Sequence, residues 1–175
     1  VGRMSTLVLV TIATLFQSCG DDNPGPKEPE IIDFDYQTVY AEAQVSTSTV
    51  LYYEDGTSNL TATLFDVLNS SDETRPLVIL SPGGGWTRYT HLDIMGAYAF
   101  NLAKRGYAVA VMNYSIASEP GAQVWVKSIL DEKAVIRFFK KNAVEYKIDT
   151  ENIFTGGWST GAQLSMYASH MDASD

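Results

Sequence analysis

The feature that most constrains the fold is a series of strand and helix patterns that alternate from Leu77 to the end of the sequence. The run Leu77-Val78-Ile79-Leu80 is apolar on both faces, which is typical of a central parallel strand covered on two sides. A second buried strand is expected at 107–112 and a short one at 152–156. Because strands that alternate with helices form βαβ units, the sequence predicts an α/β fold with a mostly parallel sheet.

The segments between these strands have helical patterns. In 92–105 the residues Ile94, Tyr98 and Leu102 recur at every fourth position, and Lys104-Arg105-Gly106 supplies the cations and the glycine that commonly end a helix. A longer helix is expected at 123–146, and a further one is expected to begin near Thr160. The apolar face predicted for the longer helix consists of Trp125, Ile129, Ile136, Phe139, Ala143 and Tyr146.

The region before Leu77 predicts strands without intervening helices. Apolar and polar residues alternate in 38–45, which indicates a half-buried strand. Further strands are expected at 51–54 and 60–68, with a turn at Glu54-Asp55-Gly56 between them. These segments predict antiparallel strands that precede the parallel part of the sheet.

The first residues are typical of an export signal. The apolar run Leu7 to Phe16 is too short to span a bilayer, and Ser18 directly precedes Cys19. This pattern resembles a bacterial lipobox, so we expect residues 1–18 to be a lipoprotein signal peptide and Cys19 to be lipidated. Plain secretion and an uncleaved anchor are the alternatives. Residues 19–32 are rich in proline and charge and predict a disordered tether, which leaves 33–175 as the folded domain.

Composition restricts the possible partners. The formal net charge of −9 argues against binding nucleic acid or an anionic lipid surface, so contact with the membrane is expected only through the lipid anchor. The expected location is the bacterial outer membrane, on its periplasmic or its outer side. A single cysteine excludes an intramolecular disulfide. No motif for a metal or a cofactor is present, so none is expected.

The pentapeptide Gly157-Trp158-Ser159-Thr160-Gly161 lies where the third parallel strand meets its helix. A sharp strand-to-helix turn exposes the Ser159 hydroxyl and directs the Thr160 N–H toward the charge that forms in acyl transfer. Small residues at 157 and 161 let the strand and the helix pass close to the serine. The alternative is a flexible glycine turn with a serine that faces solvent. The position of the motif favours Ser159 as a catalytic nucleophile.

A second glycine cluster, Gly83-Gly84-Gly85-Trp86, directly follows the Leu77 strand. Three residues without Cβ allow the backbone to approach a substrate closely. We expect the N–H groups of Gly84 and Gly85, together with that of Thr160, to form an oxyanion hole. An ordinary loop is the alternative. Trp86 is expected either to pack the loop or to border the pocket, and the sequence does not distinguish the two.

Several segments resemble the esterase/lipase branch of the α/β-hydrolases, the group with a His-Gly-Gly-Gly-Trp loop. The resemblance extends from about Leu60 to Ser169 and implies a serine carboxylic-ester hydrolase that forms an acyl-enzyme on a small acyl ester or an acylated carbohydrate. Two departures are Pro82, where the family has histidine, and Ser115, where it has arginine. The matching segments are Asp66-Val67-Leu68, Arg75 to Ile79, Ala103 to Val109, Asn113-Tyr114, Tyr146 to Asp149 and Asn152-Ile153.

The third departure concerns the catalytic acid and histidine, which the family places after the serine. His170 lies about 16 Å along the helix from Ser159, too far to accept its proton. His91 is expected to begin a helix or to border the pocket, and a role as the base is the weaker alternative. We therefore interpret the chain as a truncated and inactive form of such an enzyme, with apolar surface exposed beyond the 152–156 strand. A non-catalytic binding lipoprotein on the same scaffold is the alternative, and a serine peptidase is a weaker one.

Overall fold

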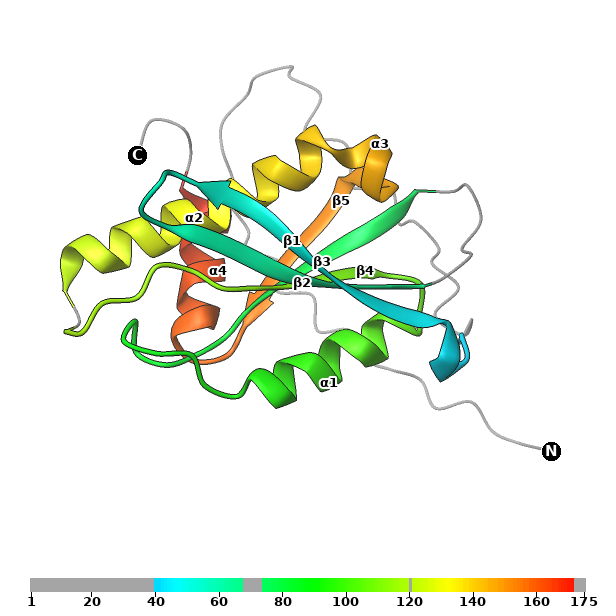
Figure 1. Ribbon diagram of the computed structural model, residues 1–175, viewed down its shortest axis with the longest axis horizontal. Coiled ribbons are helices and arrows are strands. Elements are labelled where there is room, and N and C mark those ends of the chain that lie inside the picture. Colours follow the sequence, from blue (N-terminus) through cyan, green and yellow to red (C-terminus); the bar gives the residue numbers. More distant parts are fainter. Residues whose placement is uncertain (1–39, 68–73, 120, 172–175) are drawn as a thin grey trace, which may run out of the picture. The chain divides into compact units, whose positions relative to one another are not determined.

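The structure is a computed structural model that describes residues 40–67, 74–119 and 121–171 (Figure 1). The predicted signal peptide, Cys19 and the predicted tether lie outside these residues. The elements are a 3-10 helix (Glu42–Gln44), β1 (Val45–Glu54), β2 (Asn59–Val67), β3 (Arg75–Ser81), α1 (Leu92–Ala103), β4 (Ala108–Met112), α2 (Ala122–Lys141), α3 (Ala143–Tyr146), β5 (Ile148–Gly157) and α4 (Thr160–His170).

The five strands form one sheet in the order β1-β2-β4-β3-β5. Strand β3 pairs in parallel with β4 and with β5, whereas the β1–β2 hairpin joins the sheet through an antiparallel pairing of β2 with β4. Parallel neighbours need a crossover connection, which α1 supplies between β3 and β4, and α2 with α3 between β4 and β5. The predicted α/β fold, with antiparallel strands before the parallel ones, is confirmed.

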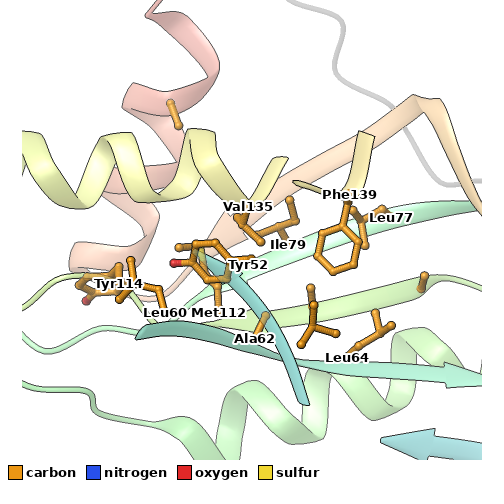
Figure 2. Packing of buried hydrophobic residues seen from close by; sticks show 14 of the residues in the cluster. Tyr52, Leu60, Ala62, Leu64, Leu77, Ile79, Met112, Tyr114, Val135 and Phe139 are labelled. Carbon is orange, nitrogen blue, oxygen red and sulfur yellow. The ribbon is translucent and has the colours of Figure 1, made fainter. Parts of the chain in front are cut away.

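Helices cover both faces of the sheet (Figure 1). On one face, α1 buries Met95, Ala99 and Ala103 against Leu80 and Val109. The other face is covered by α2 and α4 and holds the larger core (Figure 2). Its members include Tyr52, Leu64, Leu77, Ile79, Met112, Tyr114, Val135, Phe139 and Leu164.

The alternation of side chains along β3 decides where its last residue points. Leu77 and Ile79 belong to the core under α2, whereas Leu80 belongs to the core under α1. Because side chains alternate between faces, Ser81 lies on the same face as Leu77 and Ile79. This buried serine therefore points toward α2 at the carboxyl end of the central strand.

Two expectations about the first strand and the first helix are wrong in detail. Residues 42–44 form a 3-10 helix, in which the Gln44 side chain accepts the Ala41 N–H, and the strand begins only at Val45. In α1 the buried face is one residue away from the predicted one, since Tyr98 is exposed while Ala99 is fully buried. Small residues allow this helix to approach the sheet closely, and a search for large apolar side chains overlooks them.

The helix predicted at 123–146 is interrupted. Its C-cap is Asn142, whose side-chain amide donates to the Phe138 carbonyl (2.9 Å). A side-chain donor thus bonds a carbonyl at the end of the helix, where backbone donors of a further turn are lacking. Strand β5 is longer than the segment 152–156 that was expected. The predicted stop after α1 is confirmed, because Gly106 has a φ of +92° and its N–H bonds the Ala103 carbonyl.

Candidate active site

The turn between β5 and α4 consists of Trp158 and Ser159. Ser159 has φ 53° and ψ −117°, a conformation that non-glycine residues rarely adopt and that costs about 1–3 kcal/mol. Its side chain is exposed, and the structure gives its hydroxyl no hydrogen-bond partner among the described residues. The predicted geometry, an exposed serine on a strained strand-to-helix turn, is thus present.

Glycine is required on either side of this turn because the backbone at the end of β3 lies very close to both positions. A Cβ on Gly161 would lie 1.9 Å from the carbonyl oxygen of Ser81, and one on Gly157 would lie 2.5 Å from the same atom. Both distances are far below an ordinary contact, and the obstacle is backbone that cannot rotate away. The end of β3 therefore forms a wall against which the turn and the first residues of α4 are packed.

The glycine loop after β3 lies against the serine. A Cβ on Gly83 would be 3.2 Å from the Ser159 Cβ and 2.9 Å from the Trp158 carbonyl oxygen. The Gly85 N–H donates to the Thr160 side-chain oxygen (3.3 Å), which links the loop to the start of α4. Gly84 has a φ of +138°, and a side chain there would collide with the backbone of Arg88. The structure thus brings Gly84, Gly85, Ser159 and Thr160 together.

Trp86 packs the loop, which decides between the two roles left open for it. Its ring lies 6.4 Å from that of Trp125 on α2 in an edge-to-face arrangement, and it is partly buried against the core. The Trp86 carbonyl also accepts the Ala117 N–H (2.9 Å). The loop is therefore fixed to α2 and to the segment after β4.

Backbone strain occurs at the serine and at two positions near it. The non-glycine residues with positive φ among the described ones are Trp86, His91, Ser159 and also Lys147, which lies at the opposite end of β5. Trp86 follows the glycine loop, and the His91 ring lies 5.3 Å from the Trp158 ring, beside the serine. Strained backbone of this kind is common at functional sites, because the surrounding structure must hold it in place.

Neither histidine is hydrogen-bonded to Ser159. His91 is the N-cap of α1, and its Nδ1 lies 2.9 Å from the Thr90 hydroxyl. His170 is at the far end of α4, where its Nδ1 lies 2.8 Å from the Met166 carbonyl oxygen. His91 thus begins a helix as expected, and the described part of the chain shows no histidine placed to activate the serine.

The sequence reasoning overlooked a polar stripe on the buried side of α2. Ser128 donates to the Ser115 carbonyl (2.8 Å), and Asp131 accepts the Ser115 N–H (2.7 Å). Burial raises the pKa of Asp131 above its usual value. Both backbone groups of Ser115 are thus held by α2.

The third member of the stripe is Glu132, which accepts a hydrogen bond from the Ser81 hydroxyl (3.1 Å). A signal was available, because Glu132 falls between Ile129 and Ile136 on the face predicted to be apolar. A charged residue in the middle of a buried face requires an explanation. The stripe holds the carboxyl ends of β3 and β4, from which the glycine loop and the segment after β4 begin.

The two largest cavities described for this part of the chain do not have Ser159 in their lining. One of about 760 Å³ lies between the start of β2, the segment after β4 and the first turns of α2, with Tyr89 and Lys127 among its lining residues. The other, of about 520 Å³, follows β5 and α4. Beside it Phe154 and Met166 are 47% and 54% exposed. The expected exposure of apolar surface along this strand is confirmed for the described residues.

Within the residues described, no group of histidine, cysteine and carboxylate side chains is arranged to hold a metal ion. None of the described helices has the length and apolarity to cross a membrane. The lipid anchor predicted at Cys19 stays a prediction.

Comparison with known proteins gives the site a family context. Esterase LipC from Mycobacterium tuberculosis is 30% identical over 122 residues, which are 68% of this chain and 28% of that protein. Endo-1,4-beta-xylanase B from Butyrivibrio fibrisolvens is 28% identical over 111 residues, which are 62% of this chain and 17% of that protein. The chain thus spans less than a third of the length of either relative.

Solved structures of Thermogutta terrifontis esterase 2 share the architecture. The form phosphoramylated by tabun superposes with a TM-score of 0.61 at 19% identity, over 69% of this chain and 46% of that one. The propionate-bound form gives 0.61 at 20% identity, over 73% and 50%. Because the identities are this low, the superpositions show only the fold, which is that of the α/β-hydrolases. The sequence pattern of the BD-FAE family matches residues 66–174, and the chain therefore belongs to the BD-FAE family.

Proposed function

We propose that this protein is a serine carboxylic-ester hydrolase that works through an acyl-enzyme on Ser159. The observation that carries the proposal is the exposed, strained Ser159 with the glycine loop directly beside it. Membership of the BD-FAE family and similarity to an esterase support the same chemistry.

In the proposed reaction the Ser159 oxygen attacks the acyl carbon of the ester while a base takes the hydroxyl proton. The carbonyl oxygen becomes an oxyanion, which the N–H groups of Gly84, Gly85 and Thr160 stabilise. Binding at Gly85 requires its N–H to leave the Thr160 hydroxyl. The intermediate collapses, the alcohol leaves with the proton from the base, and water then hydrolyses the acyl-enzyme to release the acid. No metal or cofactor takes part.

The base and its acid partner are the missing parts of this mechanism. Among the described residues, no histidine is hydrogen-bonded to Ser159. A serine without a base is a poor nucleophile. We therefore propose that the described residues on their own have little or no hydrolase activity.

For the substrate we propose a small acyl ester or an acylated carbohydrate. Esterase 2 of Thermogutta terrifontis was solved in a butyrate-bound and in a propionate-bound form, and both ligands are short carboxylates. One curated relative is named as a xylanase, a protein that acts on a plant polysaccharide. These names support short acyl groups, and acyl groups on a polysaccharide, as the first substrates to test.

The experiment that tests the proposed function uses protein expressed from the complete gene, whether or not that gene continues past Asp175. Hydrolysis of nitrophenyl acetate and butyrate is measured, with acetylated xylan as the carbohydrate substrate. We expect hydrolysis that Ser159→Ala abolishes, and an acyl adduct on Ser159 by mass spectrometry. Hydrolysis that Ser159→Ala leaves intact would exclude Ser159 as the nucleophile.

A second candidate function is ligand binding without turnover. The cavity of about 760 Å³ favours it, because this volume suits a small ligand and Ser159 is not part of its lining. A binding protein would retain a soluble acyl carbohydrate in equilibrium dialysis, and Ser159→Ala would leave that retention unchanged. Retention without hydrolysis would favour this candidate over the esterase.

For the location we propose a lipid anchor at Cys19 that holds the protein at the bacterial outer membrane. The support is the short apolar run before the cysteine and the proline-rich segment after it. Metabolic labelling with a radioactive fatty acid tests this proposal. Label should enter the wild-type protein but not Cys19→Ala, and equal label in both would contradict the anchor.

A further inference from the structure

Glu132 is a fully buried carboxyl group in the middle of α2. It has no ion-pair partner among the described residues. Its Oε2 accepts the hydrogen bond from Ser81, while its Oε1 is buried without a hydrogen-bond partner. Because an unpaired buried carboxylate is strongly unfavourable, a group of this kind needs a reason to be there.

The partner of Glu132 is the residue that supports the turn from behind. Ser81 is fully buried, and its carbonyl oxygen accepts the Trp158 N–H (3.1 Å), the residue directly before Ser159. The same carbonyl is the atom that a side chain on Gly157 or Gly161 would strike. A displacement of Ser81 would therefore be transmitted to the turn that carries the serine.

The first turns of α4 are held from the same point. Ser165 is buried on α4, and its hydroxyl donates to the Gly161 carbonyl (3.1 Å). This hydroxyl also faces the Glu132 carboxyl, since it lowers the pKa of that group. Three elements, α2, β3 and α4, thus meet at one carboxyl group directly behind the turn.

We propose that Glu132 is a positioning residue for Ser159, which in its protonated form fastens α2 to Ser81 and Ser165 and so fixes the turn from behind. This inference rests on the proposed function for its meaning in catalysis. The geometric part, a clamp on the turn, can be tested without any activity.

The protonation state follows from what surrounds the carboxyl. Tyr114 after β4 and Tyr52 on β1 lie near enough for its charge to raise their pKa values, and the other neighbours are the hydroxyls of Ser81 and Ser165. Asp131, next to it on α2, directs its carboxyl to the Ser115 N–H. Burial without a cation raises the pKa of Glu132 to about 7, although the two serine hydroxyls oppose the rise. The clamp should therefore weaken as the pH rises from about 4.5 to 7 and change little above 7.

Two variants separate charge from hydrogen bonding. Glu132→Gln keeps the shape and the acceptor for Ser81 but never carries charge, while Glu132→Leu removes the acceptor. The infrared carbonyl band of a buried carboxylic acid should disappear in wild type with a midpoint near pH 7 and be absent from Glu132→Gln. The matched control is Glu145→Gln, which replaces an exposed glutamate on α3 and should leave the band unchanged.

Amide hydrogen exchange at Trp158 reports the clamp directly. Its protection should fall about tenfold in Glu132→Leu and change by less than about twofold in Glu132→Gln at pH 6. Protection in wild type should fall between about pH 4.5 and 7 by more than intrinsic exchange explains and then level off, and Glu132→Gln should lack this fall. If the leucine variant does not fold, the pH dependence in wild type and Glu132→Gln decides the question.

The remaining outcomes distinguish this inference from the proposed function. A band that titrates near pH 4.5, the ordinary pKa of glutamate, or Trp158 protection that none of the changes affects, would overturn the clamp. With protein from the complete gene, Glu132→Leu should lower kcat for nitrophenyl butyrate about tenfold with little change in KM. If the exchange and infrared results support the clamp but the protein hydrolyses no ester, the proposed function is wrong and the clamp is retained. Ser159-dependent hydrolysis that Glu132→Leu does not alter would sink the positioning role.

Discussion

The turn that carries Ser159 has two sides built from opposite kinds of residue. The front holds exposed side chains, Ser159 and Trp158, with His91 beside them. The back holds buried polar ones, Ser81, Glu132 and Ser165. On the front the residues are free to meet a substrate, and the backbone is strained. On the back, close packing and hydrogen bonds hold that strain in place, which is how an exposed nucleophile can be kept in a single geometry.

The largest effect is expected from a substitution that inserts an atom between the front and the back of the turn. Gly161→Ala places a Cβ 1.9 Å from the Ser81 carbonyl oxygen and 2.7 Å from that of Pro82. Because both obstacles are backbone, we expect the free energy of unfolding to fall by about 4 kcal/mol. Urea denaturation followed by circular dichroism measures it.

The matched control is Gly96→Ala, a glycine on α1 whose added Cβ would only come within 3.9 Å of the Phe65 ring. It should raise the stability by up to about 1 kcal/mol, because alanine is the better helix former. Equal effects of the two changes would show that the wall behind the turn is not tightly packed.

The next largest effect concerns pH. Glu132 has a pKa of about 7 in the folded protein against 4.5 for the ordinary group. Between these values the unfolded chain loses the proton while the folded protein keeps it, so stability falls as the pH rises and levels off above 7. This difference between the two pKa values corresponds to a loss of about 3 kcal/mol in the free energy of unfolding.

Chemical denaturation at a series of pH values, compared between wild type and Glu132→Gln, isolates this contribution. The difference in free energy of unfolding between wild type and Glu132→Gln should change between about pH 4.5 and 7 and be constant below and above this interval. Parallel curves from pH 4 to 8 would mean that the buried carboxyl does not keep its proton in the folded protein.

A smaller effect is expected on the front. Ser159→Gly removes the cost of φ 53° and should raise the free energy of unfolding by about 1–2 kcal/mol, while in protein from the complete gene it abolishes ester hydrolysis. Stability gained together with activity lost is the signature of strain kept for function. A loss of stability in this variant, measured by thermal unfolding, would show that the turn is not strained.

The smallest effect is expected at the histidines. In protein from the complete gene, His91→Ala should lower the hydrolysis of nitrophenyl butyrate by less than tenfold, since a general base contributes about 10²–10⁴. His170→Ala, at the end of α4, is the control and should not alter the rate. A loss of a thousandfold in His91→Ala would identify His91 as the base and overturn its placement at the border of the site.

The front of the site was predictable because its signals are local. A run apolar on both faces identifies β3, glycines around a serine identify the turn, and the order of strands and helices places the glycine loop beside it. Each of these depends on residues adjacent in the sequence. Trp86 was undecided because its partner, Trp125, is distant in the chain.

The back was not predictable in the same way, since its partners come from three separate elements. Helical periodicity places Glu132 on the buried face of α2, but nothing near it in the sequence reveals that Ser81 will accompany it. The strand expected at 38–45 failed for a related reason. Its alternating pattern was outweighed by local bonds such as that of Gln44 to the Ala41 N–H, together with the bond from the Tyr40 N–H to the Lys104 carbonyl.

The measurement that tests the central claim most directly is the rate of nitrophenyl butyrate hydrolysis by protein from the complete gene, with and without Ser159→Ala. We predict hydrolysis that the single change reduces to the uncatalysed rate, in a gene that supplies an acid and then a histidine after Asp175. Hydrolysis that persists in Ser159→Ala would contradict the assignment of the nucleophile. The absence of hydrolysis from a gene that supplies no such residues would contradict the esterase and leave the binding function.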